Sequence, residues 1–346
     1  MAWLHHLTAN QHLVLFSAIK IVGVIAVVLP MVAYSVWAER KICASIQDRI
    51  GPNRVGPAGL WQPLADGLKT FLKEDLVPAH VRKIYFWLAP MILLTPALMV
   101  LAVIPFGSQL GGEKMVIADL NVGILYTFGI VSLGVYGIVL AGYASNSKYP
   151  FLGGIRSSAQ MISYEIAMGM SVIPVFLIVG ELNLGKVIQY QAEHGWLILY
   201  APISFVIFLV SAFAETNRLP FDLPESEQEL VGGYNTEYSS MKFALFFMGE
   251  YANMIAASAM MVTLFLGGWT LPLAGLNRPA DTIAMGIVHI IVFLAKVGLL
   301  MTMFIWVRWM WPRFRYDQLM DLGWRRFLPL ALANIVGTAV WLWANA

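Results

Sequence analysis

Charged residues are scarce in this chain. Only 12% of its 346 residues are Asp, Glu, Lys or Arg, 59% are hydrophobic, and the mean hydropathy is +0.71. A soluble domain carries roughly twice that charged fraction, because its surface must be covered by polar groups. The composition therefore excludes an ordinary cytosolic enzyme. A disordered or fibrous chain is excluded as well, since 12 Trp, 13 Tyr and 19 Phe occur without low-complexity tracts.

Cysteine and catalytic motifs are almost absent. A single cysteine, Cys43, excludes internal disulfides, and alone it cannot hold zinc or an iron–sulfur cluster, which need about four ligands. No Ser-His-Asp arrangement, dinucleotide fingerprint, phosphate-binding loop or cluster of metal ligands is present. We therefore expect no metal and no bound cofactor in this chain, and any redox chemistry must occur on a partner.

Long apolar runs are what the sequence has instead. A membrane-spanning helix needs about 20 mostly apolar residues. Eight stretches fit, at about 13–38, 85–105, 122–144, 159–179, 196–214, 243–266, 283–306 and 327–342. The sequence predicts an all-α polytopic membrane protein, a single helical domain over 1–346 with eight transmembrane helices.

The distribution of Lys and Arg predicts the orientation. The segments 39–83, 145–157, 215–242 and 308–326 hold 17 basic residues, whereas the three opposite loops hold one each. Because basic residues accumulate on the cytoplasmic side, these four segments are predicted to be cytoplasmic and both termini periplasmic.

The first cytoplasmic loop, 39–83, contains an amphipathic stretch. Its apolar side chains fall on one helical stripe and its polar ones on the other. The apolar members are Leu60, Leu64, Leu68, Phe71 and Leu72, and the polar members are Gln62, Asp66, Lys69 and Lys73. This pattern predicts an interfacial helix. It either anchors the loop only, or covers the mouth of a cavity open to lipid.

The second cytoplasmic loop, 215–242, is strongly acidic. Between 215 and 240 it carries six acids against the single Arg218. Crowded acids raise the pKa of some members, so they can exchange protons near neutral pH. The alternative is a solvated loop that docks onto a basic partner.

Three of the four charged residues within predicted spans are candidates for a function, Glu165, Glu250 and Lys296, whereas the fourth, Lys20, is expected to extend to the nearby outer interface. Ionisable groups are costly in a membrane and are by default functional candidates. Glu39 and Glu215 mark the cytoplasmic ends of the first and fifth spans. Together the five can form a line of carboxylates with a lysine at its inner end, as a proton relay requires. Each could instead be a buried polar anchor between helices.

Several motifs resemble one family. They are Glu39-Arg40-Lys41 with Gly51-Pro52-Asn53-Arg54-Val55-Gly56-Pro57, then Ala214-Glu215-Thr216-Asn217-Arg218-Leu219-Pro220-Phe221-Asp222-Leu223-Pro224-Glu225 continuing to Glu227 and Glu229, and Pro312-Arg313-Phe314-Arg315-Tyr316-Asp317-Gln318-Leu319-Met320. Ser145-Asn146-Ser147-Lys148-Tyr149 and Ser163-Tyr164-Glu165 also fit. The sequence is similar, over nearly its whole length, to the H subunit of proton-pumping NADH:quinone oxidoreductase (respiratory complex I), the counterpart of mitochondrial subunit 1. A departure is Leu219, where the family often has a small residue.

The resemblance implies two sets of site residues. Arg40, Asp66, Arg218, Phe221, Asp222 and Glu225 would line or border a quinone tunnel that opens to lipid beside the first span and the amphipathic helix. Glu39, Glu165, Glu215, Glu227 and Glu250 would couple quinone chemistry to proton movement, with Lys296 in a less defined role.

The same resemblance implies partners and a location. Quinone would be the substrate, NADH, FMN and iron–sulfur clusters would belong to partner subunits, and the chain would lie among other complex I subunits and lipid in a bacterial inner membrane. No nucleic-acid partner is expected. Three alternatives remain: the homologous subunit of a membrane-bound hydrogenase or a ferredoxin- or formate-linked complex, a cation transporter acting alone, and a membrane anchor without a catalytic part.

Overall fold

The computed structural model describes residues 9–223, 232–272 and 275–345, and its regular structure is almost entirely helical. In chain order the helices are α1 (Ala9–Ile46), a 3₁₀ turn (Pro57–Gly59), α2 (Gln62–Leu72), α3 (Lys83–Val100), α4 (Gly123–Ala144), α5 (Lys148–Val179), α6 (Leu184–His194), α7 (Pro202–Glu215), α8 (Ser240–Phe265), α9 (Ile283–Met310), α10 (Tyr316–Asp321), a π-helical turn (Leu322–Phe327) and α11 (Leu328–Asn345). A short antiparallel pair, β1 (Gln109–Leu110) and β2 (Glu113–Lys114), lies between α3 and α4. The predicted all-α class is confirmed.

Seven helices of the described chain are long and apolar enough to cross a membrane. They are α1, α3, α4, α5, α8, α9 and the continuous C-terminal helix Tyr316–Asn345. The predicted polytopic membrane architecture is confirmed at this level. The expected count of eight is not confirmed, because the segment predicted at 196–214 forms a shorter apolar helix, Pro202–Glu215.

That shorter helix is α7. Residues 196–201 form turns, with the Leu199 amide donating to the Trp196 carbonyl, so the helix begins only at Pro202. Its 14 residues extend about 21 Å at 1.5 Å per residue, less than the roughly 30 Å of a bilayer core. Its last residue, Glu215, is half-buried and lines a small space between helices of the bundle.

Two other helices extend beyond the spans predicted for them. Helix α1 continues to Ile46 instead of ending at residue 38, and α5 begins at Lys148 instead of 159. Hydropathy falls at both places, but neither Gly nor Pro interrupts α1 between Glu39 and Ile46, so the backbone continues as a helix. Glu39 and Arg40 thus lie on helical turns and not in a loop.

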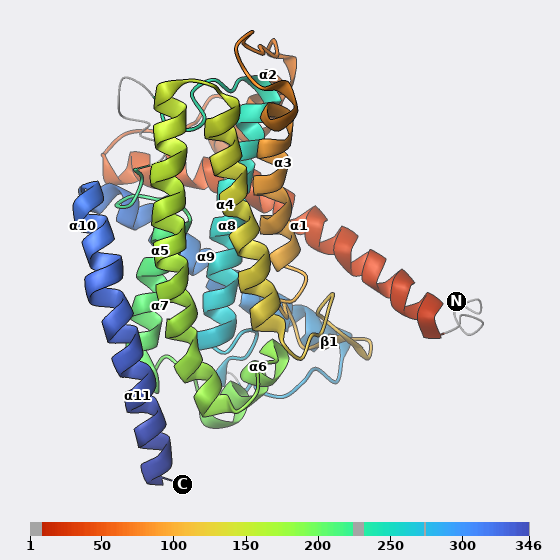
Figure 1. Cartoon of the computed structure of the whole chain (residues 1–346). Coiled ribbons are helices and arrows are strands. Elements are labelled where there is room, and N and C mark those ends of the chain that lie inside the picture. The colour runs from red at the N-terminus through yellow and green to blue at the C-terminus, as the bar shows by residue number, and fades with distance from the viewer. Residues whose placement is uncertain (1–8, 224–231, 273–274, 346) are drawn as a thin grey trace.

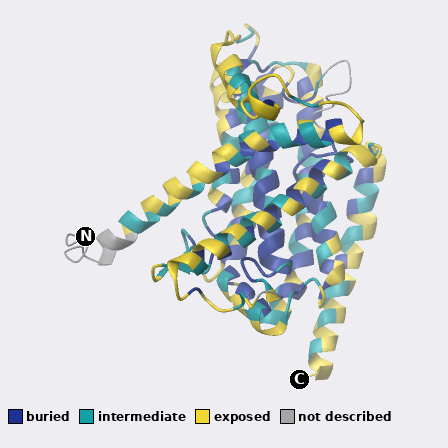
Figure 2. Ribbon diagram, turned by 180° about the vertical axis from the view of Figure 1, so that it is seen from behind, coloured by how far each residue is buried: buried dark blue, intermediate teal, exposed yellow. Residues whose placement is uncertain are grey.

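The long helices α3, α4, α5 and α8 run nearly parallel through the middle of the molecule, and α1 leans away from them (Figure 1). Helix α2 lies at one end of this bundle, whereas α6 and β1 lie at the opposite end (Figure 1). Figure 2 shows that buried residues concentrate in the centre and that α1 between Val14 and Val27 is largely exposed. Exposed apolar residues on α1, such as Val14 and Val22, are suited to contact lipid.

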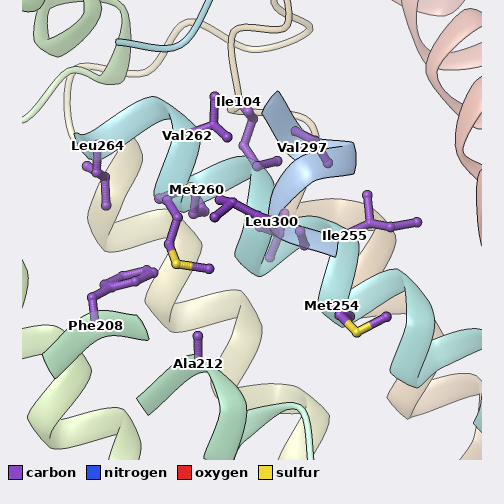
Figure 3. Packing of buried hydrophobic residues seen from close by; sticks show 14 of the residues in the cluster. Ile104, Phe208, Ala212, Met254, Ile255, Met260, Val262, Leu264, Val297 and Leu300 are labelled. Carbon is purple, nitrogen blue, oxygen red and sulfur yellow. The ribbon is translucent and has the colours of Figure 1, made fainter. Parts of the chain in front are cut away.

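Helix α8 is at the centre of the main hydrophobic core. Met254, Ile255 and Met260 on this helix pack among side chains of α7 and α9, including Phe208 and Leu300 (Figure 3).

Close backbone approaches between helices depend on glycine at particular sites. A Cβ on Gly137 of α4 would lie 2.8 Å from the Leu93 amide nitrogen of α3. Such small residues permit tight helix packing in a membrane.

Candidate functional site

The largest feature of the site is a cavity of about 950 Å³ between α1, α2, the first half of α8 and the end of α9. Apolar side chains, among them Val32, Phe71 and Phe247, form much of its wall. Its charged lining includes Glu39 and Arg308. The volume lies in the range of pockets that bind small organic molecules, which also combine apolar walls with a few polar groups.

A buried ionic cluster closes one side of this cavity. Glu39, which is 7% exposed, accepts hydrogen bonds from Arg218 at 3.3 Å and from the Tyr251 hydroxyl at 2.5 Å, and it forms an ion pair with Arg308. The Arg218 guanidinium also lies over the Tyr251 ring, 4.2 Å from its centroid. One carboxylate from α1 therefore connects residues from α8, α9 and the turn after α7. A buried carboxylate requires such compensation for its lost hydration.

The turn after α7 is buried and ordered, not a solvated acidic loop, over its described residues 216–223. Gln160 of α5 donates to the Ala214 and Phe221 carbonyls, each at 2.8 Å. The Phe221 ring stacks on Phe314, with centroids 5.4 Å apart. Asp222 is 5% exposed and pairs with Arg313 at 3.4 Å. Arg218, Phe221 and Asp222 thus do not line the cavity themselves, and of the three it is Arg218 that contacts the cavity-lining Glu39.

Arg40 and Asp66 connect α1 to α2. The Arg40 guanidinium donates to Asp66 at 2.7 Å, and Gln62 donates to the other Asp66 oxygen at 3.1 Å. All three residues line the cavity. The structure therefore brings Arg40 and Asp66, which the resemblance assigns to the tunnel, to one cavity with Glu39, which it assigns to proton coupling.

Glu250 and Tyr251 are adjacent on α8 but face different neighbours. Tyr251 binds Glu39, whereas Glu250 accepts a 2.7 Å hydrogen bond from the fully buried Tyr234. Consecutive helical residues point about 100° apart, so α8 carries one polar group toward the cavity and another toward the hydrophobic cluster around Tyr234 and Phe246.

Glu215 lies on a second, smaller cavity of about 40 Å³ enclosed by α3, α4, α5, α7 and α8. Thr127 and Asn253 line the same space. A cavity needs about 10–15 Å³ to hold one water, so this space, whose wall is mostly apolar with a few polar groups, has room for about three. Glu165, half-buried on α5, is close enough for its charge to interact with that of Glu215.

Lys296 lies elsewhere, toward the end of the bundle that carries α6. Its ammonium donates to the carbonyls of Leu266, Gly268 and Thr270 at 2.6, 2.9 and 2.6 Å. It also lies 4.8 Å from the Trp196 ring centroid. Among the described residues, no carboxylate pairs with Lys296; its ligands are the backbone carbonyls that follow α8.

Two predicted site residues, Glu225 and Glu227, lie outside the described residues. Sequence reasoning missed Tyr251, Arg308, Tyr234 and Asn253. The sequence places Arg308 only among the basic residues predicted to be cytoplasmic. A tyrosine or asparagine within an apolar run does not by itself indicate a functional site. In the described part of the chain, no group of three or more His, Cys, Asp or Glu side chains is arranged to hold a metal ion.

Comparisons with known proteins cover nearly the whole chain. The NADH dehydrogenase family model matches residues 19–339. The NADH-quinone oxidoreductase H subunit of Rhodospirillum rubrum is 52% identical over 94% of this chain and 94% of its own length. The H subunit of Paramagnetospirillum magneticum is also 52% identical, over 93% and 91%, and an H subunit of Cytophaga hutchinsonii is 48% identical, over 93% and 95%. With this similarity over the same helices that form both cavities, the chain belongs to the H-subunit family of NADH-quinone oxidoreductase.

Proposed function

We propose that this chain is a membrane subunit of a bacterial NADH-quinone oxidoreductase, that its large cavity admits the quinone, and that its buried glutamates couple quinone reduction to proton movement. The observation that carries the proposal is the meeting of an apolar cavity with the ionic cluster of Glu39, Arg218, Tyr251 and Arg308. The names of the relatives support the quinone oxidoreductase over a hydrogenase-type complex.

The cavity suits a quinone on chemical grounds. A quinone joins an apolar tail to a ring with two carbonyl acceptors. The apolar wall, with Val32 and Phe247, can contact the tail, while guanidinium groups such as those of Arg40 and Arg308 can donate to carbonyl oxygens. Helix α2 exposes its apolar stripe on the outer side, which suits a position in the membrane interface beside the entrance.

The proposed coupling depends on charge changes in a poorly hydrated interior. Quinone reduction takes up electrons and protons, and a change of charge beside Glu39 alters its attraction to two arginines. Electrostatic effects are larger there than in water. Glu215, Glu165 and Glu250 are the next acids available to respond, and Glu227 belongs to the same proposal. The carbonyl ligands of Lys296 give its predicted place in the relay the least support.

Partner subunits would carry FMN and the iron–sulfur clusters and would complete the quinone headgroup site. The chain would span the inner membrane with both termini on the periplasmic side. In this arrangement the α2 end of the bundle faces the cytoplasm, where the peripheral partners bind NADH.

The test replaces Glu39 by Gln in the assembled complex. Membranes are assayed for NADH oxidation by ferricyanide, which takes electrons near the flavin, and by quinone. We expect ferricyanide activity to persist and quinone activity to fall at least about tenfold, because Gln cannot pair with two guanidinium groups.

Glu181→Gln is the matched control, since Glu181 forms an exposed ion pair with Lys186 at the opposite end of the bundle. Equal quinone activity in Glu39→Gln and Glu181→Gln membranes would overturn the proposed site.

A further inference from the structure

Helix α2 forms one wall of the large cavity, yet none of its side chains is buried. Leu64, Leu68 and Leu72 are exposed on its outer side. Apolar packing against the bundle therefore does not fix its position. Its described polar contacts fix it instead. Arg40 and Asp66 pair near the start of the helix. Near its end, Ser240 and Lys242 of α8 contact Thr70, Lys73 and Asp75, and these five residues form the α2–α8 joint.

The joint begins with Ser240, the first residue of α8. The Ser240 hydroxyl lies 2.9 Å from the Thr70 carbonyl and 3.0 Å from the Lys73 carbonyl. Carbonyls in the last turn of a helix lack partners within that helix. Ser240 thus caps α2 from another helix. It does so with φ of 54°, a conformation that residues other than glycine seldom adopt.

Lys242 completes the joint two residues further along α8. Its side chain is 3% exposed, and its ammonium lies 2.6 Å from both Asp75 carboxylate oxygens. The Trp87 ring of α3 has its centroid 3.9 Å from the ammonium, and the Phe86 ring has its centroid at 5.5 Å. A cation in the first turn of a helix is opposed by the helix dipole, so these contacts have to compensate for an unfavourable position.

Cavity-lining residues belong to both helices that meet at this joint. Thr70 and Phe71 of α2 line the cavity, as do Met241 and Phe243 of α8, which flank Lys242. A change in the distance between Ser240 and the end of α2 would therefore change the width of the cavity there. Most of the lining on this side is apolar, so it would contact the tail of a bound molecule.

We propose that Ser240 and Lys242 are positioning residues that hold the end of α2 against α8 and thereby set the width of the cavity for a long apolar tail. This rests on the proposed function, in which the cavity admits a quinone. The joint acts through α2 and not on the quinone ring, so it affects binding of the tail more than turnover of bound quinone.

The test uses Lys242→Met in the assembled complex in native membranes. Methionine keeps an unbranched side chain beside Trp87 but removes the ion pair with Asp75. We expect KM for a long-tailed quinone to rise by about threefold or more, KM for a short-tailed analogue to change less, and kcat to stay within about twofold. Lys242→Arg, which keeps the charge, should restore most of the affinity.

Ferricyanide activity reports the amount of assembled complex in each preparation, and Lys186→Met is the control for removing an exposed lysine from an ion pair at the opposite end. If Lys242→Met does not assemble, Asp75→Asn tests the same ion pair from its exposed side. Unchanged KM in the assembled variant, or a lower kcat with unchanged KM, overturns the positioning role. The proposed function fails separately, through an unimpaired Glu39→Gln.

Discussion

The structure holds the buried carboxylate of Glu39 and the half-buried ammonium of Lys296 in opposite ways. Glu39, beside the large cavity, is bound by Arg218, Arg308 and Tyr251, so its partners are ionisable or protonatable side chains. Lys296, at the other end of the bundle, is bound by three backbone carbonyls. The first arrangement depends on the charge state of several groups, whereas the second depends only on that of the lysine.

Under the proposed function, this difference would separate a group that responds to quinone chemistry from one that supports the fold. If a quinone or proton changes the charge near Glu39, its arginines can redistribute between partners. The carbonyls around Lys296 cannot change charge and belong to the turn that follows α8. We therefore expect the two sites to affect different measurements when each is altered.

The largest expected effect follows from Arg218→Leu. It leaves the buried Glu39 with less compensation, and breaking a buried ion pair costs about 3–5 kcal/mol. Quinone-linked turnover should fall about 100-fold, corresponding to roughly 3 kcal/mol, with ferricyanide activity retained. Arg218→Lys should recover part of the loss.

Arg325→Leu serves as the control for Arg218→Leu, because Arg325 is exposed and pairs with Asp321 at the surface. Normal quinone turnover in Arg218→Leu would mean that the Glu39 cluster supports packing alone, and the contrast with Lys296 would disappear.

A smaller effect is expected at the second cavity from Asn253→Leu. Leucine removes the amide from the cavity that Glu215 also lines and occupies space suited to water. If water there carries protons to or from Glu215, quinone-linked turnover should fall several-fold, with a larger solvent isotope effect. Asn253→Ser, which keeps a polar group and more space, should retain more activity. Equal turnover in both variants would remove this cavity from the coupling route.

Lys296→Met tests the contrast with Glu39, since we expect it to lower thermal stability and to leave quinone turnover unchanged. Losing three hydrogen bonds from a charged donor should destabilise the α8–α9 packing by about 1–3 kcal/mol. Thermal inactivation should occur at a lower temperature, while quinone turnover per assembled complex stays near that of the wild type. Reduced turnover in fully assembled complex would instead place Lys296 in the relay.

The general architecture is accessible from the sequence because apolar length and basic-residue distribution act locally. Seven long helices and the amphipathic α2 follow from such patterns. The shortness of α7 is not accessible, because Trp196 to Ala201 is as apolar as a helix but forms turns. Hydropathy indicates whether a segment prefers apolar surroundings to water, and it does not specify the backbone conformation of that segment.

The site is predictable in part for a related reason. Carboxylates in apolar runs are conspicuous, so Glu165 and Glu250 can be identified from the sequence. Their partners cannot, since the pairing of Glu250 with Tyr234, or of Glu39 with Arg308, depends on contacts between distant segments. The family resemblance points to Arg218, but only the fold shows that it is buried and contacts Glu39.

The smallest expected effect concerns Asp119, a paired charge that is not buried and so provides the third case in the comparison. It accepts hydrogen bonds from Lys114 at 2.6 Å and from Asn183 at 2.8 Å. These contacts, led by that from Lys114, hold the pKa of Asp119 below its usual 3.8. Its contribution to stability is thus present at neutral pH and is lost as pH falls through the lowered pKa.

Asp119→Asn should consequently have a limited, pH-dependent effect. Exposed ion pairs contribute about 0.2–1 kcal/mol, so hydrogen exchange in α6, which Asn183 caps, should accelerate by no more than about fivefold at neutral pH. The difference from the wild type should shrink as pH falls through the lowered pKa of Asp119, because the wild-type carboxyl then loses its charge. A larger effect at neutral pH would show that an exposed ion pair here contributes as much as a buried one. Pairing with opposite charges, more than burial, would then distinguish Glu39 from Lys296, which binds only carbonyls.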